Sequence, residues 1–136
     1  MRVLIGHDGS TASDHALERA IAFFREGSDE FVVLRAFTRP LTTADGADEI
    51  AEAARVEAHE ELEQVRQTLL RAGVQGRLRL IEGDARDVLD RVVAEECPDV
   101  VVLGARGASG LAKLLLGSVS SYAVKHLSCP VLIVRD

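Results

Sequence analysis

The 136-residue sequence predicts an α/β fold in which four helices cover an open, doubly wound, five-stranded parallel sheet. Five short apolar runs alternate along the chain with four longer stretches that repeat apolar residues at helical spacing. Within three of the runs, the segments 31–34, 100–103 and 131–134 are continuously apolar, as strands buried on both faces of a parallel sheet are. The expected strands are residues 2–7, 30–37, 77–82, 99–104 and 130–135, and the expected helices are residues 11–26, 46–72, 85–96 and about 118–128.

The first half of the chain holds two strands and two helices in alternation. The helix expected after the first strand has an apolar face of Ala16, Leu17, Ala20, Ile21 and Phe24. The longest helix, residues 46–72, ends at Gly73, because glycine adopts the left-handed conformation of a helix C-cap without steric cost. We expect the apolar face of this second helix to comprise Ile50, Ala54, Ala58, Leu62, Val65 and Leu69.

The third strand differs from the others in its texture. Arginine and leucine alternate over residues 77–80, which indicates a strand with one face exposed. Charged side chains also discourage unwanted pairing at the edge of a sheet. The sequence therefore places this strand at one edge, followed by the helix at 85–96 and by the strand at 99–104.

Composition excludes several classes of protein. The formal net charge is −6 and no run of Lys and Arg occurs, which argues against a nucleic-acid partner. No apolar stretch reaches the roughly 20 residues that span a bilayer, and the N-terminus lacks a signal-peptide core, so we expect no membrane association. Cys97 and Cys129 lack the spacing of metal ligands and are expected to be reduced thiols in the core of a cytoplasmic protein. The length fits a single domain over residues 1–136.

The stretch "GARGASGLAKLLLGS" at 104–118 joins the fourth strand to the last helix. Ligands of open parallel sheets bind beyond the carboxyl ends of the strands. Glycine lets the backbone approach a ligand closely, and the first amides of a helix attract anions. The stretch therefore predicts a phosphate site, with a flexible loop that binds nothing as the alternative. The P-loop and dinucleotide-binding glycine patterns are both absent.

Several polar residues near these strand ends allow two interpretations each. Asp8 either contacts a ribose or a metal-bound phosphate, or forms an Asx turn. Ser10 is expected to cap the first helix, and Ser118 either caps the last helix or contacts phosphate with Ser120 and Ser121. Arg106 either reaches a phosphate or is solvated.

The spacing G-x2-G-x9-G-S of Gly104, Gly107, Gly117 and Ser118 resembles the nucleotide-binding signature of the universal stress protein (UspA-like) family, in its ATP-binding branch. The stretches "HDGS", "PDVVVLGARG" and "LLGSVSSYAVKHLSCPVLIV" are similar to that family, so the resemblance covers nearly the whole chain. It implies a Rossmann-like sheet of the adenine nucleotide alpha hydrolase type, with strand order 3-2-1-4-5 and the nucleotide bridging the first and fourth strands.

The resemblance also implies which residues bind the nucleotide. Adenine would lie against His7, Asp8, Ala36 and Leu103, with main chain near Asp8 and Ala36 reading its edge. The ribose and phosphates of ATP, AMP or cAMP would lie over Gly104 and Gly107, with Mg²⁺ reaching Asp8 through the phosphates. The phosphate tail would meet Gly117, Ser118, Val119 and Ser120. The sequence departs from the family at Ala105, often a serine, and at His7, which replaces a small apolar residue and would either stack on adenine or narrow the pocket.

The last strand predicts self-association. Residues 130–135 carry no charge before Arg135, and an uncharged apolar edge invites pairing with a second copy. The resemblance likewise implies a homodimer through this strand. We expect a regulatory, nucleotide-binding protein rather than an enzyme, with segments 38–46 and 105–116 coupling ligand to conformation. The alternatives are a weak ATP hydrolase or autokinase and a dimerisation module without ligand.

Overall fold

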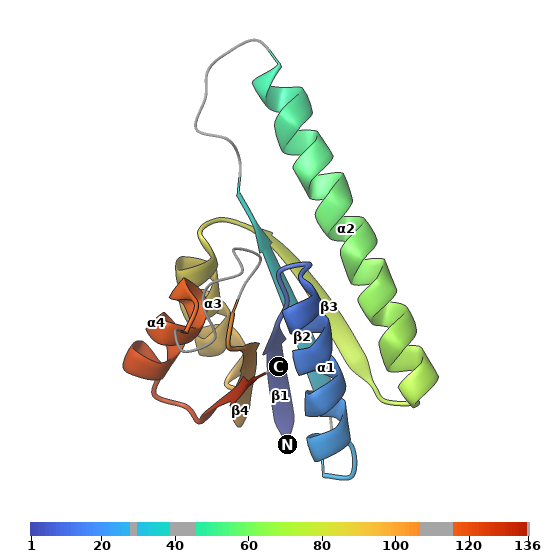
Figure 1. Ribbon diagram of the computed structural model, residues 1–136, viewed down its shortest axis with the longest axis vertical. Helices are drawn as coiled ribbons and strands as arrows, with labels where there is room; N and C mark the ends of the chain where they lie inside the picture. The colour runs from blue at the N-terminus through green and yellow to red at the C-terminus, as the bar shows by residue number, and fades with distance from the viewer. Residues whose placement is uncertain (28–29, 39–45, 107–115, 136) are drawn as a thin grey trace.

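The computed structural model describes residues 1–27, 30–38, 46–106 and 116–135, and these form an α/β fold built on a five-stranded sheet (Figure 1). Gly107 and most of the two segments expected to move, 38–46 and 105–116, lie outside the described residues. Along the chain the elements are β1 (Arg2–Gly6), α1 (Thr11–Phe24), β2 (Glu30–Phe37), α2 (Ala47–Ala72), β3 (Gly76–Glu82), α3 (Ala85–Glu96), β4 (Val100–Gly104), α4 (Ser118–His126) and β5 (Val131–Val134).

The strand order is β3-β2-β1-β4-β5, and every neighbouring pair is parallel. The predicted order is confirmed, and so is the placement of β3 at an edge. Because β1 lies between β2 and β4, the chain leaves β1 toward one side of the sheet and later returns to β4 on the other side. This reversal opens a crevice at the carboxyl ends of β1 and β4, which positions the site described below.

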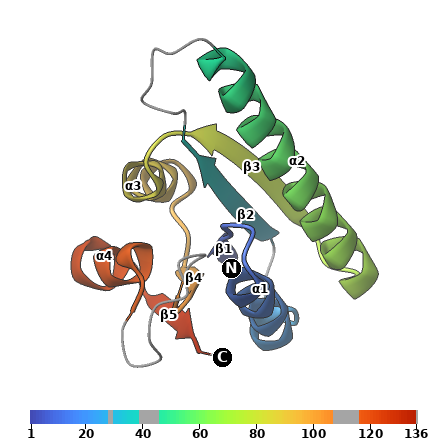
Figure 2. The same ribbon diagram turned by 45° about the horizontal axis from the view of Figure 1, so that its top comes forward.

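The sheet separates two cores. Helices α1 and α2 cover one face, and α3 and α4 cover the other (Figure 2). Side chains of β1 alternate between these cores: Val3 and Ile5 pack beneath α1 and α2, whereas Leu4 packs beneath α3 and α4. Within the described part of the chain, no helix combines the length and the apolarity that a membrane crossing requires.

Helix α2 buries a different set of residues near its start from the set that the sequence predicted. Ile50 is 54% exposed, and Ala51 is buried instead. The prediction followed a spacing of four residues, which advances about 400° and so drifts about 40° around the helix at each step. Twelve residues before Leu62, this drift has moved Ile50 off the buried face. The buried residues are Ala51, Ala58, Leu62, Val65 and Leu69.

The ends of α1 and α2 follow local rules. The Oγ atom of Ser10 accepts a hydrogen bond of 3.1 Å from the amide of Ser13, so the predicted cap of α1 is confirmed. Gly73 has a φ of 69°, the left-handed conformation in which glycine ends a helix. Its amide donates to the carbonyl of Leu70, which satisfies one of the last carbonyls of α2.

A network of charges closes the amino end of the sheet. Glu96, at the end of α3, is a buried carboxylate, with 7% of the residue exposed. Arg77 of β3 donates to both of its oxygens, at 3.1 and 2.6 Å, and Arg79 donates to it at 3.2 Å. Arg2 of β1 forms an ion pair with Glu96 at 3.7 Å. Arg77 also donates a hydrogen bond to Glu30 of β2. The network ties α3 to three neighbouring strands at this end.

Candidate functional site

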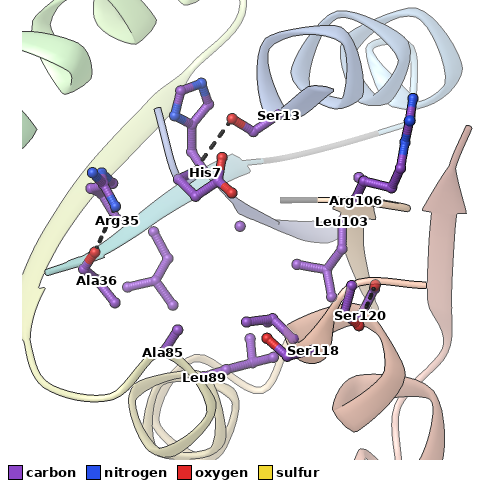
Figure 3. Close-up of a pocket in the computed structure, with 16 residues that line it drawn as sticks. His7, Ser13, Arg35, Ala36, Ala85, Leu89, Leu103, Arg106, Ser118 and Ser120 are labelled. Carbon is purple, nitrogen blue, oxygen red and sulfur yellow. Dashed lines mark hydrogen bonds between the residues drawn. The ribbon is translucent and has the colours of Figure 1, made fainter. Parts of the chain in front are cut away.

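A pocket of about 310 Å³ opens at the carboxyl ends of β1, β2 and β4, on the face of the sheet that α3 and α4 cover. One end is apolar, and the other end is formed by main chain at the end of β4 and the start of α4 (Figure 3). The lining residues are Gly6, His7, Asp8, Ser13, Leu34, Arg35, Ala36, Ala85, Leu89, Leu103, Gly104, Arg106, Gly117, Ser118, Val119 and Ser120.

The pocket brings together the site residues that the sequence predicted on three separate strand ends. Ten of the eleven predicted residues line it, and the eleventh, Gly107, lies outside the described residues. The ten are His7, Asp8, Ala36, Leu103, Gly104, Arg106, Gly117, Ser118, Val119 and Ser120.

The start of α4 forms the main-chain end of the pocket. Gly117 is the N-cap residue, with φ −65° and ψ 169°, and no side chain makes a capping hydrogen bond there. Of the two roles expected for Ser118, the cap is therefore wrong, because Ser118 is already the first helical residue, and the phosphate contact stays a prediction. The first amides of a helix have no partner within the helix. Those of Ser118, Val119 and Ser120 belong to residues that line the pocket, so this end is suited to an anion.

The hydroxyl of Ser120 has a structural role. It lies 3.1 Å from the carbonyl oxygen of Ala105 and 3.1 Å from that of Gly117, and it donates to these acceptors. The amide of Gly117 donates to the same Ala105 carbonyl at 2.7 Å. These bonds fix the start of α4 against the end of β4. They also direct the Ser120 hydroxyl to main chain, so Ser120 can offer an anion its amide rather than its hydroxyl.

Asp8 forms the Asx turn that was one of its two expected roles. Its Oδ1 atom accepts a hydrogen bond of 2.9 Å from the amide of Ser10. Gly9, between them, has a φ of 85°, which glycine adopts without strain. Asp8 also lines the pocket, so the turn holds the carboxylate at the pocket wall and the two interpretations are compatible.

His7 lines the pocket with its backbone, while its ring lies toward α1 near Ser13 (Figure 3). The alternation along β1 puts residue 7 on the same face as Ile5, beneath α1. The amide of Gly9 donates to Nδ1 at 3.1 Å, which assigns the ring proton to Nε2, 2.8 Å from the Asp14 carboxylate. The ring is thus held away from the pocket, and it neither stacks in the pocket nor narrows it.

Gly6 precedes His7 and faces the opposite side of the sheet, so Gly6 rather than the His7 ring lies beside the pocket. A Cβ atom at Gly6 would lie 2.4 Å from the Cδ2 atom of Leu103, far inside van der Waals contact. Leu103 thus packs over the bare backbone of Gly6 and forms part of the apolar wall. The alternation rule applied to the end of the first strand would have found this residue from the sequence.

Five further lining residues were missed. Leu34 precedes Ala36 by two positions and shares its face, so the same alternation would have indicated it. Ala85 and Leu89 stand one turn apart on α3, and only the packing of α3 against the sheet brings them to the pocket. The remaining two are Ser13 and Arg35.

Charged groups are few at this pocket. Arg106 lines it, but its side chain runs from the wall toward α1, away from Ser120 (Figure 3). Among the residues that the structure describes, no three His, Cys, Asp or Glu side chains are grouped so that they could hold a metal ion. The site therefore combines an apolar cavity with main-chain donors, an arrangement suited to a flat apolar group that carries an anion.

Comparisons with known proteins identify the family of the chain. The universal stress protein family matches residues 1–135 of the chain. Universal stress protein YxiE of Bacillus subtilis is 30% identical over 146 residues, covering 98% of both chains. Universal stress protein MJ0531 of Methanocaldococcus jannaschii is 30% identical over 138 residues, covering 98% of this chain and 81% of the relative.

Solved structures of that family share the fold. UspA of Lactobacillus plantarum superposes with a TM-score of 0.88 at 20% identity, over 99% of this chain and 97% of its own. A family protein of Arabidopsis thaliana, solved with AMP bound, has a TM-score of 0.75 at 21% identity and coverages of 99% and 91%. A universal stress protein solved in complex with cAMP has a TM-score of 0.66 at 25% identity and coverages of 98% and 96%. On the match over residues 1–135, this chain belongs to the universal stress protein family.

Proposed function

We propose that the chain is a regulatory protein that binds an adenine nucleotide, ATP, AMP or cAMP, in the pocket between β1, β4 and α4. The observation that carries the proposal is the start of α4, where a helix without a side-chain cap begins at the wall of a pocket with an apolar far end. Phosphates would meet the amides of residues 118–120, and the purine would lie against Ala36 and Leu103.

Related proteins support this choice of ligand. Two structural neighbours were solved with AMP and with cAMP, and both contain adenine. The spacing of Gly104, Gly107, Gly117 and Ser118 supports the ATP-binding branch of the family. Magnesium would enter the site bound to the phosphates, and Asp8, which lines the pocket, would be the carboxylate that contacts it.

The proposal includes a homodimer through residues 130–135. Among the described residues, β5 pairs with β4 along one side and forms an edge of the sheet along the other. Val131, Leu132 and Ile133 are half-buried in the single chain. Pairing of two such edges would cover these apolar side chains and would satisfy the main-chain groups of the strand. Size-exclusion chromatography with light scattering tests this part.

We propose a binding role rather than catalysis, in a protein of the cytoplasm. Both cysteines are free thiols, which fits a reducing compartment. Cys97 is exposed, so its expected place in the core is wrong. Weak ATP hydrolysis and self-phosphorylation are the enzymatic alternatives. Incubation with excess ATP and magnesium separates them from binding, because a regulatory protein is expected to return the nucleotide unchanged and to acquire no phosphate.

The test of nucleotide binding begins with the freshly purified protein. The chain has no tryptophan and one tyrosine, so bound nucleotide would dominate its ultraviolet spectrum with a peak near 260 nm. Titration calorimetry with ATP, AMP and cAMP on protein stripped of nucleotide then measures the affinities. A spectrum without that peak, together with no heat from any of the three, contradicts the proposal.

A variant at Gly117 separates ligand binding from folding. Gly117 is buried, and its φ of −65° is open to any residue, so Gly117→Val adds bulk at the helix start without backbone strain. We expect nucleotide binding to be lost while the thermal unfolding transition and the dimer remain. Ser128→Val, an exposed position beyond the end of α4, is the matched control and is expected to bind like the wild type. A dimerisation module without ligand would show no binding in any of the three proteins.

A further inference from the structure

Arg35 lines the pocket at the end of β2, opposite the start of α4 (Figure 3). Its side chain leaves the strand on the face that α2 covers and reaches the edge of the pocket at the Ala36 carbonyl. Arg35 lies next to Ala36, and its side chain is 19% exposed. Its Nη1 atom donates a hydrogen bond of 2.8 Å to the carbonyl oxygen of Ala36. A guanidinium therefore stands beside the main-chain acceptor that a base in this pocket would meet.

Glu61 of α2 holds this guanidinium in place. The Nε atom of Arg35 donates to Oε2 of Glu61 at 3.0 Å, and the two side chains are largely buried. The same carboxylate lies against Gly9, since a Cβ atom there would come within 2.5 Å of Oε2. Glu61 is thus fixed between the loop after β1 and the end of β2. The Arg35 guanidinium is held at Nε by Glu61 and at Nη1 by the Ala36 carbonyl.

The edge of a purine meets two kinds of group at this place. A carbonyl oxygen has two lone pairs, so the Ala36 oxygen can accept one more hydrogen bond besides that from Arg35. The guanidinium only donates, and two of its five N–H groups make the bonds to Ala36 and Glu61. Acceptor and donors therefore stand side by side.

A carbonyl alone would select adenine. It would attract the 6-amino group and repel the 6-oxo group of hypoxanthine or guanine, whose oxygen would be buried without a donor. With the guanidinium present, a 6-oxopurine can place its N1–H on the Ala36 carbonyl and its O6 against an Arg35 N–H. Adenine keeps its own bond from the 6-amino group to the carbonyl, and its N1 can also accept from the guanidinium. Without Arg35, adenine loses that one bond to N1, whereas the O6 of a 6-oxopurine is left facing the Ala36 oxygen.

We infer that Arg35 makes the pocket accept 6-oxopurine nucleotides as well as adenine nucleotides, with Glu61 as its positioning residue. The inference rests on the proposed function, because it takes the phosphates to lie at α4 and the base to lie at Ala36. The inference concerns the ratio of the affinities for a 6-oxopurine nucleotide and an adenine nucleotide. Both ligands make the same phosphate contacts, so the free energy of those contacts cancels in the ratio.

The experiment compares ATP with ITP, which differ at the 6-position of the base. On the wild type, titration calorimetry is expected to give dissociation constants within about tenfold of each other. Arg35→Ala should weaken ITP by about tenfold or more relative to ATP, as loss of a hydrogen bond to a charged donor predicts. Arg35→Lys keeps a cationic donor and should give an intermediate ratio, and Glu61→Gln should move the ratio in the same direction as Arg35→Ala.

Arg55→Ala is the matched control. Arg55 also lies in an arginine–glutamate pair, with Glu52, but on the exposed side of α2. Its removal should leave both affinities unchanged. The inference is overturned if the wild type binds ITP more than about a hundredfold more weakly than ATP, or if both Arg35 variants keep the wild-type ratio. If the wild type binds neither ITP nor any of ATP, AMP and cAMP, the proposed function itself is overturned and the inference falls with it.

Discussion

The two ends of the sheet treat polar groups in opposite ways. At the amino end, Glu96 is buried and accepts hydrogen bonds from Arg77 and Arg79, so its charge is paired within the fold. At the carboxyl end, glycines stand at 6, 104 and 117, and the start of α4 has no side-chain cap. The polar groups of the amino end bond one another within the fold, whereas the main-chain donors at the start of α4 are available to the ligand proposed above.

The difference follows from which kind of group each end contains. A buried carboxylate without partners would be strongly destabilising, so the amino end must pair its charges within the fold. The amides at a helix start can be left to solvent at little cost, since water replaces the ligand when none is bound. Changes at the amino end should therefore alter stability, and changes at the carboxyl end should alter binding.

The largest effect is expected from Glu96→Ala, which leaves three arginines without their shared carboxylate. Removing one partner of a buried ion pair costs about 3–5 kcal/mol, and the partial exposure of Arg77 and Arg2 reduces this to about 2 kcal/mol here. Urea unfolding measures the loss. Glu95→Ala, at the half-exposed neighbour, is the control and should lose less. Equal losses in the two variants would show that the network does not hold α3.

Acid is expected to remove part of the same stabilisation. Hydrogen bonds from Arg77, aided by the charges of Arg79 and Arg2 and opposed by burial, hold the pKa of Glu96 below its usual range. A carboxyl whose folded pKa is lowered stabilises the fold above its unfolded pKa of about 4.3, and this is lost as pH falls through the folded value. The unfolding free energy of Glu96→Ala should therefore decline less steeply below pH 4.3 than that of the wild type. Parallel declines would contradict this assignment.

A substitution at the carboxyl end should show the opposite balance. In Gly6→Ala the new methyl group must displace Leu103, whose Cδ2 atom lies 2.4 Å from the ideal Cβ position. The displaced side chain has room in the pocket, so the fold should lose about 1 kcal/mol while nucleotide affinity falls by about tenfold. Calorimetry and urea unfolding on the same preparation measure both. A large loss of stability with unchanged affinity would mean that Leu103 moves away from the pocket instead.

The fold was predictable because several independent patterns agreed. Continuous apolar runs indicated the strands that both cores bury, and alternating Arg77, Leu78, Arg79 and Leu80 indicated the edge. The error at Ile50 arose because a spacing of four residues was followed over three helical turns. The full strand order came from the family resemblance, since local patterns say little about which strands pair.

The site residues could be predicted where glycines show that the backbone approaches a ligand. They could not be predicted where only tertiary packing brings a side chain to the pocket. Gly104 and Gly117 are visible in the sequence because few other roles explain so much glycine at one junction. Leu89 and Arg35 carry no such mark, since any helix has leucines and any strand end can bear an arginine. Capping, one of the two roles expected for Ser118, is wrong for a different reason: serine is a common cap, but the helix starts one residue earlier and makes Ser118 its first helical residue.

The smallest effects are expected from a pair of serines at two helix starts of the same end. Ser10 caps α1 through its hydroxyl, so Ser10→Ala should lose about 1 kcal/mol of stability and leave nucleotide affinity within about twofold. Ser118 is exposed and makes no capping bond, so Ser118→Ala should change stability by less than about 0.5 kcal/mol. Its hydroxyl stands at the pocket wall, so nucleotide affinity should fall severalfold. If Ser118→Ala instead lost as much stability as Ser10→Ala, the start of α4 would be held by a cap, and the contrast between the two ends of the sheet would fail at the place that matters most for binding.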